Sequence, residues 1–381
     1  LHLLSRRQRQ MCIRDRVGTA SFSDMSSIGS LAMTELHSVG GLTIKNCKEI
    51  SIVELPGLIS CGETSVDANT VNKLNLASLK DVFGDMTLSN LLIEELDLSQ
   101  TNFNGNTLTL QCAQLNKIVG PETFNGSLLL CPTNCRLTEF TLEGISNIQG
   151  DFQCINYFYV KEFVMPFIRV AGDMTIALNS GSVNTGAEIE FPKLQEIGGT
   201  LTLGTNRNAN NITFPLLKKI LGSCSVTTYK LKNDIEFTNL ESIGTDGADA
   251  QIKFEIEATN ILCPKLKTIN GKFDIATSSF MFDMEADQVS YPNVESISEN
   301  LSITCPYSDF GSNGILSIDF SGLKSAKGIS ISGQGDVTDF SSFKYLFENN
   351  VLTGESQWSV KECGYNPTFQ EMKDGKYKLA E

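Results

Sequence analysis

The chain has 381 residues, of which 41% are hydrophobic and 8% aromatic, and its formal net charge is −14. One hydrophobic core rarely serves a chain of this length, so several domains or a repeat array are expected. The acidic balance and the lack of a basic stripe argue against a nucleic-acid partner. No run of 18 apolar residues occurs, so the sequence predicts no membrane-spanning helix.

Residues 1–16 differ from the rest of the chain, because they contain five arginines and one aspartate. A basic start with a short apolar run is typical of a damaged targeting signal. The stretch from Arg9 to Arg16 also resembles translated sequencing-adapter read-through. We therefore predict a non-native leader over 1–16 and exclude it from the fold prediction. A signal peptide or a lipid-attachment cysteine is then expected in the native N-terminus.

One sequence unit recurs along the chain, and Phe191 to Leu203 shows it clearly. It contains Phe-Pro, then Leu194 and Ile197 three residues apart, a glycine pair, and an alternating strand that ends at Leu203. Alternation with a period of two predicts a strand with one buried face. The first inward residues of the predicted strands are Leu42, Thr64, Met86, Leu108, Leu128, Phe152, Met174, Leu201, Cys224, Ile252, Phe273, Leu301 and Ile329. Successive members lie 20 to 28 residues apart, which is typical of a solenoid.

Three further features of the unit predict a corner between strands. A Leu-x-x-Ile element precedes most strands, as in Leu217 and Ile220. Its prefix is often an apolar residue followed by proline, which suits a corner because proline fixes φ and cannot donate to a β-ladder. Glycines before the strands are expected where positive φ or a close backbone approach is required. They are Gly40, Gly62, Gly84, Gly126, Gly150, Gly172, Gly198 and Gly271.

Each unit is therefore predicted to form one coil of a parallel β-structure, and stacked coils share a continuous core. From about Leu31 to Ile331 this pattern resembles the leucine-rich-repeat-like receptor L-domain, which forms the ligand-binding lobes of insulin and epidermal growth factor receptors. It is also similar to fungal GPI-anchored cell-wall proteins and to leucine-rich surface proteins of gut Bacteroidetes. The resemblance implies a mainly β, right-handed leucine-rich-repeat-like solenoid of about 13 coils over 17–338. Eukaryotic L-domain receptors carry cysteine-rich modules that are absent here, so receptor signalling is not implied.

Residues 339–381 depart from the repeat and are predicted to form a helical cap and a C-terminal tail. The pattern from Asp339 to Asn349 predicts a short helix with an aspartate N-cap. Its apolar residues Phe343, Leu346 and Phe347 fall on one side. A cap of this kind protects the open end of a solenoid. The tail that follows, rich in Lys and Glu from Glu371 onward, is expected to fray.

Most of the eleven cysteines are interpreted as small buried hydrophobes rather than as a disulfide framework. They occupy apolar positions of the repeat, as Cys61, Cys112, Cys154, Cys224 and Cys263 do. Cys131 and Cys135 are either a loop disulfide or half of a metal site. Zinc is not expected, because the chain has only two histidines and no second close cysteine pair.

The sequence predicts no catalytic residue, metal ligand or cofactor. Outside the leader the only histidine is His37, whose place in a surface turn favours a solvated side chain over a nucleophile system. Four acidic residues precede strands in one predicted column: Glu63, Asp85, Asp151 and Asp173. Stacked carboxylates can form a solvated edge, bind calcium or cleave sugars. A carbohydrate-active β-helix enzyme that uses Asp151 and Asp173 is therefore an alternative.

Two groups of aromatic residues are candidate binding sites. Tyr157 and Tyr159 lie in a coil where aromatics concentrate, and they either contact a ligand or pack inside the coil. Phe280 and Phe282 lie in a predicted loop insertion, Ser279 to Asp287, and loops that project from one side of a solenoid often bind partners. The outward strand positions are mostly Thr and Ser, which suits either an ordinary exposed strand or a polar contact face.

Together these patterns predict a non-catalytic binding or adhesion protein at the cell surface. The expected ligand is an extracellular protein or a glycan, and the expected attachment is a lipid anchor in the native N-terminus. Besides the β-helix enzyme, a structural cell-wall spacer is an alternative.

Overall fold

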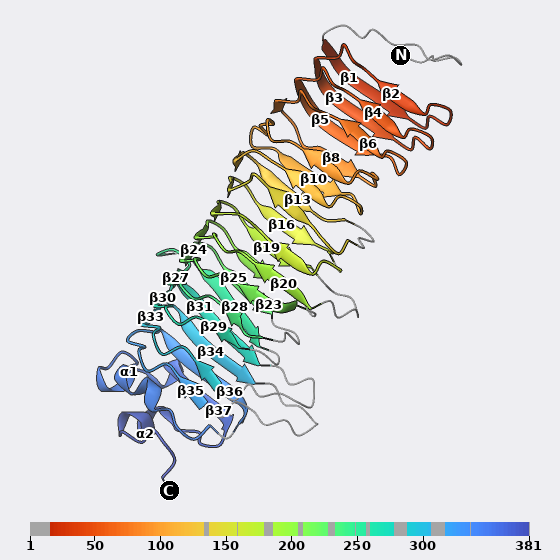
Figure 1. Ribbon diagram of the computed structural model, residues 1–381. Coiled ribbons are helices and arrows are strands. Elements are labelled where there is room, and N and C mark those ends of the chain that lie inside the picture. Colours follow the sequence, from red (N-terminus) through yellow and green to blue (C-terminus); the bar gives the residue numbers. More distant parts are fainter. Residues whose placement is uncertain are drawn as a thin grey trace. The chain divides into compact units, whose positions relative to one another are not determined.

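The computed structural model describes residues 16–132, 137–157, 159–178, 186–204, 209–227, 233–247, 249–256, 260–277, 288–305, 317–335 and 337–380. The chain forms two compact units, Leu1–Val160 and Lys161–Glu381. The described residues form a parallel β-solenoid with little helix, in agreement with the predicted fold class. In each unit the strands of a main sheet lie stacked one after another along the chain (Figure 1).

The first unit has one long main sheet and shorter sheets that flank it. The main sheet contains β1 (Arg16–Ser23), β3 (Ser38–Lys45), β5 (Ser60–Asp67), β8 (Met86–Ser89), β10 (Thr107–Gln111), β13 (Ser127–Leu130) and β16 (Phe152–Ile155), with β7 (Asp81–Val82) beside β5. The flanking strands are β2 (Ser30–Ala32), β4 (Ile52–Glu54) and β6 (Lys73–Asn75), then β9 (Glu95–Asp97), β11 (Lys117–Val119) and β14 (Thr141–Glu143), and the pair β12 (Thr123–Phe124) and β15 (Asn147–Ile148).

The second unit repeats this plan. Its main-sheet strands are β19 (Met174–Ala177), β22 (Leu201–Leu203), β25 (Cys224–Thr227), β28 (Ala250–Ile256), β31 (Gly271–Thr277), β34 (Asn300–Cys305), β36 (Gly328–Gly335) and β37 (Trp358–Cys363). A second sheet holds β17 (Glu162–Val164), β20 (Ala187–Glu190), β23 (Ala209–Thr213), β26 (Ile235–Glu236) and β29 (Ile261–Leu262), and β32 (Gln288–Ser290) pairs with β35 (Ser317–Asp319). A third sheet holds β18 (Arg169–Val170), β21 (Glu196–Ile197), β24 (Lys219–Ile220), β27 (Ser242–Ile243), β30 (Thr268–Ile269) and β33 (Ser296–Ile297).

The predicted strand starts lie opposite one another within each unit, which confirms the register inferred from the repeat. Leu42 pairs with Thr64, and Thr64 pairs with Met86. Within the second unit, Leu201 lies opposite Cys224 in the same way. These inward residues are buried, as a period-two pattern requires when one face of a sheet meets the core.

The apolar-proline prefix forms the predicted corner. At most of these prefixes the N–H of the apolar residue three positions on donates to the carbonyl of the prefix residue, as Leu58 does to Leu55 at 3.1 Å and Leu194 to Phe191 at 3.3 Å. Proline at the second position of such a turn costs no hydrogen bond, because that N–H would be unpaired. The prefix side chains stack from coil to coil, since the Phe214 ring lies 4.9 Å from that of Phe191 and 5.0 Å from that of Phe237.

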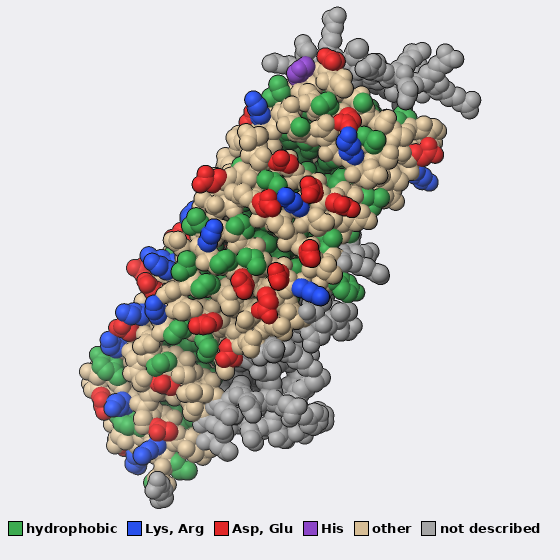
Figure 2. Space-filling model, viewed as in Figure 1, with side chains coloured by type: hydrophobic (Ala, Val, Ile, Leu, Met, Phe, Trp, Pro, Cys, Tyr) green, Lys and Arg blue, Asp and Glu red, His purple; other side chains and the backbone are tan. Residues whose placement is uncertain are grey.

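The surface of the third sheet in the second unit carries charges that alternate in sign from one coil to the next. Lys218, Glu241, Lys267, Glu295 and Lys324 follow one another in successive coils, and each N–H donates to the carbonyl of the preceding member at 2.8 to 3.0 Å. The Lys324 ammonium pairs with the Glu295 carboxylate at 2.8 Å. Figure 2 shows acidic and basic side chains mixed along the edge where Figure 1 labels β24, β27, β30 and β33. We name this row the charge ladder.

The core thiols are buried, as the repeat predicted. Cys112 and Cys224 are free cysteines with 2% and 0% exposure. Burial raises the pKa of Cys112 to about 11 and that of Cys224 to about 12, because a thiolate loses its hydration in an apolar core. Cys135, which was considered as a partner for Cys131, lies outside the described residues.

We expect these two thiols to resist alkylation in the folded chain. The thiolate is the reacting form, and an unfolded thiol ionises near its ordinary pKa of 9.0. Iodoacetamide just above that pH should therefore label Cys112 and Cys224 in urea but not without it, as read by mass spectrometry of peptides. Because the folded pKa is raised, the unfolded chain loses these protons first, so stability should fall as pH rises from 9 towards 12. Rapid labelling of Cys224 in the native chain would contradict its placement in the core.

The C-terminal segment forms more regular structure than the sequence suggests. The predicted helix is present as a 3-10 turn η1 (Ser341–Phe343) and α1 (Lys344–Glu348), and Phe343, Leu346 and Phe347 are buried. After η2 (Glu355–Gln357), β37 adds an unpredicted strand to the main sheet. The expectation of a fraying tail is wrong at α2 (Phe369–Lys373), because Thr368 and Glu371 form a capping box and Met372 is fully buried.

Candidate functional site

The spacing between paired positions changes within the main sheet of the first unit. Cys61 and Thr64 of β5 pair with Val82 and Met86 respectively, so two residues in β5 lie opposite three in the next coil. The additional residue separates β7 from β8. Insertions of this kind redirect a side chain and often lie next to functional sites. Here the N–H of Phe83 still donates to the Cys61 carbonyl at 2.8 Å, while the residue is 64% exposed.

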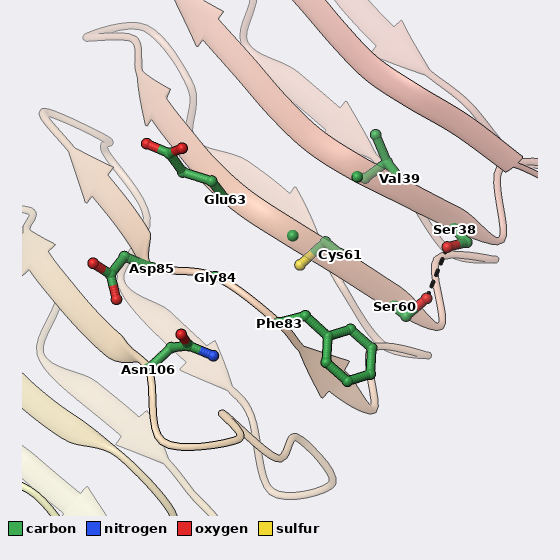
Figure 3. Close-up of a pocket in the computed structure, with 11 residues that line it drawn as sticks. Ser38, Val39, Ser60, Cys61, Glu63, Phe83, Gly84, Asp85 and Asn106 are labelled. Carbon is green, nitrogen blue, oxygen red and sulfur yellow. Dashed lines mark hydrogen bonds between the residues drawn. The ribbon is translucent and has the colours of Figure 1, made fainter.

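Phe83 borders a groove of about 690 Å³ in the first unit. Gly40, Gly62 and Gly84 line it, and a Cβ at each would meet the backbone of the neighbouring coil, so these glycines allow the coils to approach closely. Figure 3 shows the Phe83 ring on one side, with Glu63 and Asp85 on the other. Ser38, Ser60 and Asn106 complete the polar lining (Figure 3). We name this space the Phe83 groove.

The polar groups of the groove differ in how far they are already bonded. The Asn106 amide nitrogen donates to the carbonyls of Phe103 at 2.8 Å and Val82 at 3.2 Å. The Ser60 hydroxyl donates to the Ser38 hydroxyl at 2.9 Å (Figure 3). One oxygen of Asp85 accepts from the Thr107 N–H at 2.8 Å. Among the described residues nothing bonds the exposed carboxylate of Glu63, so this side chain is open to a ligand.

Two carboxylates of the predicted acidic column accept hydrogen bonds from backbone N–H groups of the next coil. Like Asp85, Asp173 accepts from the backbone of the next coil, here the Thr200 N–H at 2.6 Å. Ser127 takes the same role at its position, because its hydroxyl accepts from the Asp151 N–H at 2.9 Å. Asp151 and Asp173 belong to different units, and the structure tests no pairing between them. Backbone capping thus accounts for two of the four carboxylates.

Only part of the predicted aromatic site can be located. Tyr157 is 3% exposed, and its ring lies 5.0 Å from that of Phe140. This matches the alternative of interior packing, because so small an exposed area offers little contact to an external ligand. Tyr159 is half-buried. Phe280 and Phe282, with the predicted loop Ser279 to Asp287, lie outside the described residues.

The remaining predicted surface features lie where the repeat places them. His37 is exposed, and its Nδ1 lies 2.9 Å from the Glu35 carbonyl oxygen. The outward hydroxyls of the first unit form a register column through Thr43, Ser65 and Thr87, and each is half-buried. Within the described ranges, no three His, Cys, Asp or Glu side chains gather closely enough to hold a metal ion.

A second groove of about 820 Å³ lies at the opposite ends of the first main-sheet strands. It is lined mainly by aspartates and asparagines, and the carboxylates are engaged by neighbouring amides. Asn46 donates to Asp24 at 3.2 Å, and Asn90 donates to Asp67 at 2.8 Å. Asp24, Asn46 and Asn90 have positive φ, a conformation that Asn and Asp adopt more readily than other side chains. These asparagine and aspartate side chains therefore stabilise the turns between coils.

The sequence did not single out Phe83. Three residues separate Val82 from the strand start Met86, and the same number separates Ile197 from Leu201, so the spacing does not mark this coil. Among the helices in the described parts of the chain, none combines the length and apolar character needed to cross a membrane. Comparison with protein-family models, curated proteins and solved structures found no match to the chain.

Proposed function

We propose that the chain is a non-catalytic binding or adhesion protein, displayed at a cell surface, that contacts a protein or glycan ligand through the Phe83 groove. The right-handed, leucine-rich-repeat-like array of about 13 coils predicted from the repeat belongs to this proposal. The surface location rests on the resemblance of the repeat to surface and cell-wall proteins. Labelling of intact cells with a membrane-impermeant reagent tests the location separately from binding.

The observation that carries the proposal is the exposure of Phe83 beside an open groove. Burial of a phenylalanine side chain stabilises a protein by about 1.5–3 kcal/mol. Because Phe83 is largely exposed, most of this free energy is not gained on folding. A ligand that covers the ring can gain it on binding. The groove volume of about 690 Å³ also lies within the range of about 300–1,000 Å³ that is usual for ligand sites.

Replacement of Phe83 by alanine is expected to weaken ligand binding by about tenfold or more, which corresponds to the lower end of that burial energy. The measurement uses an array of glycans and extracellular-matrix proteins, probed with the full chain and with the Phe83→Ala variant. Leu216→Ala is the matched control, because Leu216 is also an exposed apolar residue, at 42%, but belongs to the second unit.

The array also separates the groove from the predicted loop. A Phe280→Ala/Phe282→Ala double variant that alone loses binding would move the site to that loop. Equal signals from wild-type protein and Phe83→Ala would contradict the groove as the contact site. An array on which the wild-type chain binds nothing would favour the spacer alternative.

A further inference from the structure

We propose that the Phe83 groove receives a lysine or arginine side chain presented by a protein partner. This inference rests on the proposed function, because it names the chemistry of the ligand at the same site. It follows from three features of the groove: the balance of hydrogen-bond donors and acceptors, the charge of the lining, and the position of the aromatic ring.

The side chains that line the groove offer mostly acceptors. The carboxylate of Glu63 accepts only, as does the second oxygen of Asp85. The amide hydrogens of Asn106 are used within the protein, which leaves its carbonyl oxygen towards a ligand. The Ser60 hydroxyl already donates to the Ser38 hydroxyl. Among the side-chain hydroxyls and amides of the lining, the Ser38 hydroxyl is therefore the one donor left for a ligand. A matching ligand group must therefore donate.

The lining is also negatively charged without compensation. It contains Glu63 and Asp85 but no lysine or arginine, and among the described residues neither carboxylate takes part in an ion pair. Elsewhere in the chain this fold does pair its charges, as Lys73 does with Glu54 at 2.7 Å. A net charge of −14 further raises the local concentration of cationic ligands.

The exposed ring supplies the remaining part of a cation site. The face of an aromatic ring attracts a cation electrostatically. Phe83, Glu63 and Asp85 all line the groove, with the ring at one end and the two carboxylates, which point away from it in Figure 3, at the other. A lysine or arginine side chain can lay its aliphatic stem against the ring while its head reaches the acidic wall. Lysine brings three donors and arginine five, and neither brings an acceptor.

A neutral sugar matches this lining less well. Its hydroxyls can donate to these acceptors, but a neutral sugar brings no positive charge to compensate the two carboxylates. An anionic glycan would place like charges together. Of the two ligand classes in the proposed function, the groove therefore favours a protein that carries a basic side chain.

The test measures binding of a fluorescent glycine-lysine peptide to the full chain by anisotropy. The same peptide with every lysine acetylated keeps the length but removes the charge. Maltoheptaose is the neutral-glycan probe. We expect the lysine peptide to bind at least about tenfold more tightly than the acetylated one, and to weaken with added salt. Phe83→Ala and Glu63→Gln should each lower its affinity several-fold. Glu162→Gln, which removes one charge from the second unit, is the control for non-specific attraction and should have no effect.

The outcomes distinguish this inference from the proposed function. If the acetylated peptide or maltoheptaose binds equally well and depends on Phe83, the groove is a ligand site but not a cation site. If Glu162→Gln weakens binding of the lysine peptide as much as Glu63→Gln does, the peptide is attracted by the overall negative charge of the chain, and the inference fails. If Phe83→Ala changes neither this binding nor the array, both proposals fail. Thermal unfolding of each variant checks that the fold is intact.

Discussion

An alanine in place of Gly62 is expected to destabilise the first unit by about 3 kcal/mol. A Cβ at this position would overlap the carbonyl oxygen of Gly40 in the neighbouring coil. Both residues lie in ladder-bonded strands of the main sheet, so the backbone atoms cannot move apart without breaking hydrogen bonds. The change should appear as a lower midpoint in urea unfolding followed by circular dichroism.

Gly18 provides the matched control for this variant. It lies in β1, in the same column of the sheet, but a Cβ there would meet nothing within 4 Å. Gly18→Ala should therefore change the stability by no more than about 0.5 kcal/mol. Equal loss of stability at the two positions would show that these glycines are needed for their backbone conformation rather than for close packing of the coils.

Removal of the Phe214 ring is expected to destabilise the second unit by about 3–5 kcal/mol. The ring is fully buried and stacks between those of Phe191 and Phe237, so Phe214→Ala leaves a cavity bounded by two coils. The neighbouring rings are fixed to their own corners and cannot close the gap. Thermal and urea unfolding of the full chain measure the loss.

Leu216→Ala is the comparison for Phe214→Ala, because Leu216 lies two residues further on and is 42% exposed. Its replacement should cost less than about 0.5 kcal/mol. A Phe214→Leu variant, which fills part of the space, should fall between the two. A stable Phe214→Ala chain would mean that the aromatic stack contributes little to the core.

The repeat in the sequence predicted the register because each coil places the same side-chain type at the same inward position. Once Leu42 and Thr64 are aligned, the alternation determines the face of every following residue in those strands. The method fails where a strand has few inward residues. In β37 only Trp358 is fully buried and polar residues follow, so the segment shows no clear period. The five-residue helix α2 is likewise too short for a helical pattern.

The candidate site was harder to predict, because the exposure of an aromatic side chain depends on the local backbone path and not on residue type alone. A concentration of aromatic residues favoured Tyr157, yet such residues are also what fills a core, and its ring packs on Phe140. Phe83 stands alone in sequence, and the three residues between Val82 and Met86 are matched by three between Ile197 and Leu201. Neither composition nor spacing therefore predicts its exposure.

The charge ladder has a consequence for how the second unit folds. Neighbouring coils of a repeat protein have similar sequences, so a coil can in principle pair with the next-but-one coil by mistake. Such a skip would bring Lys218 beside Lys267, or Glu241 beside Glu295, and each mismatch places like charges about 4.8 Å apart. The correct order instead sets opposite charges side by side at every step. The alternation of charge therefore disfavours a skipped coil, in addition to the preference that the differing inward residues Leu201, Cys224 and Ile252 impose.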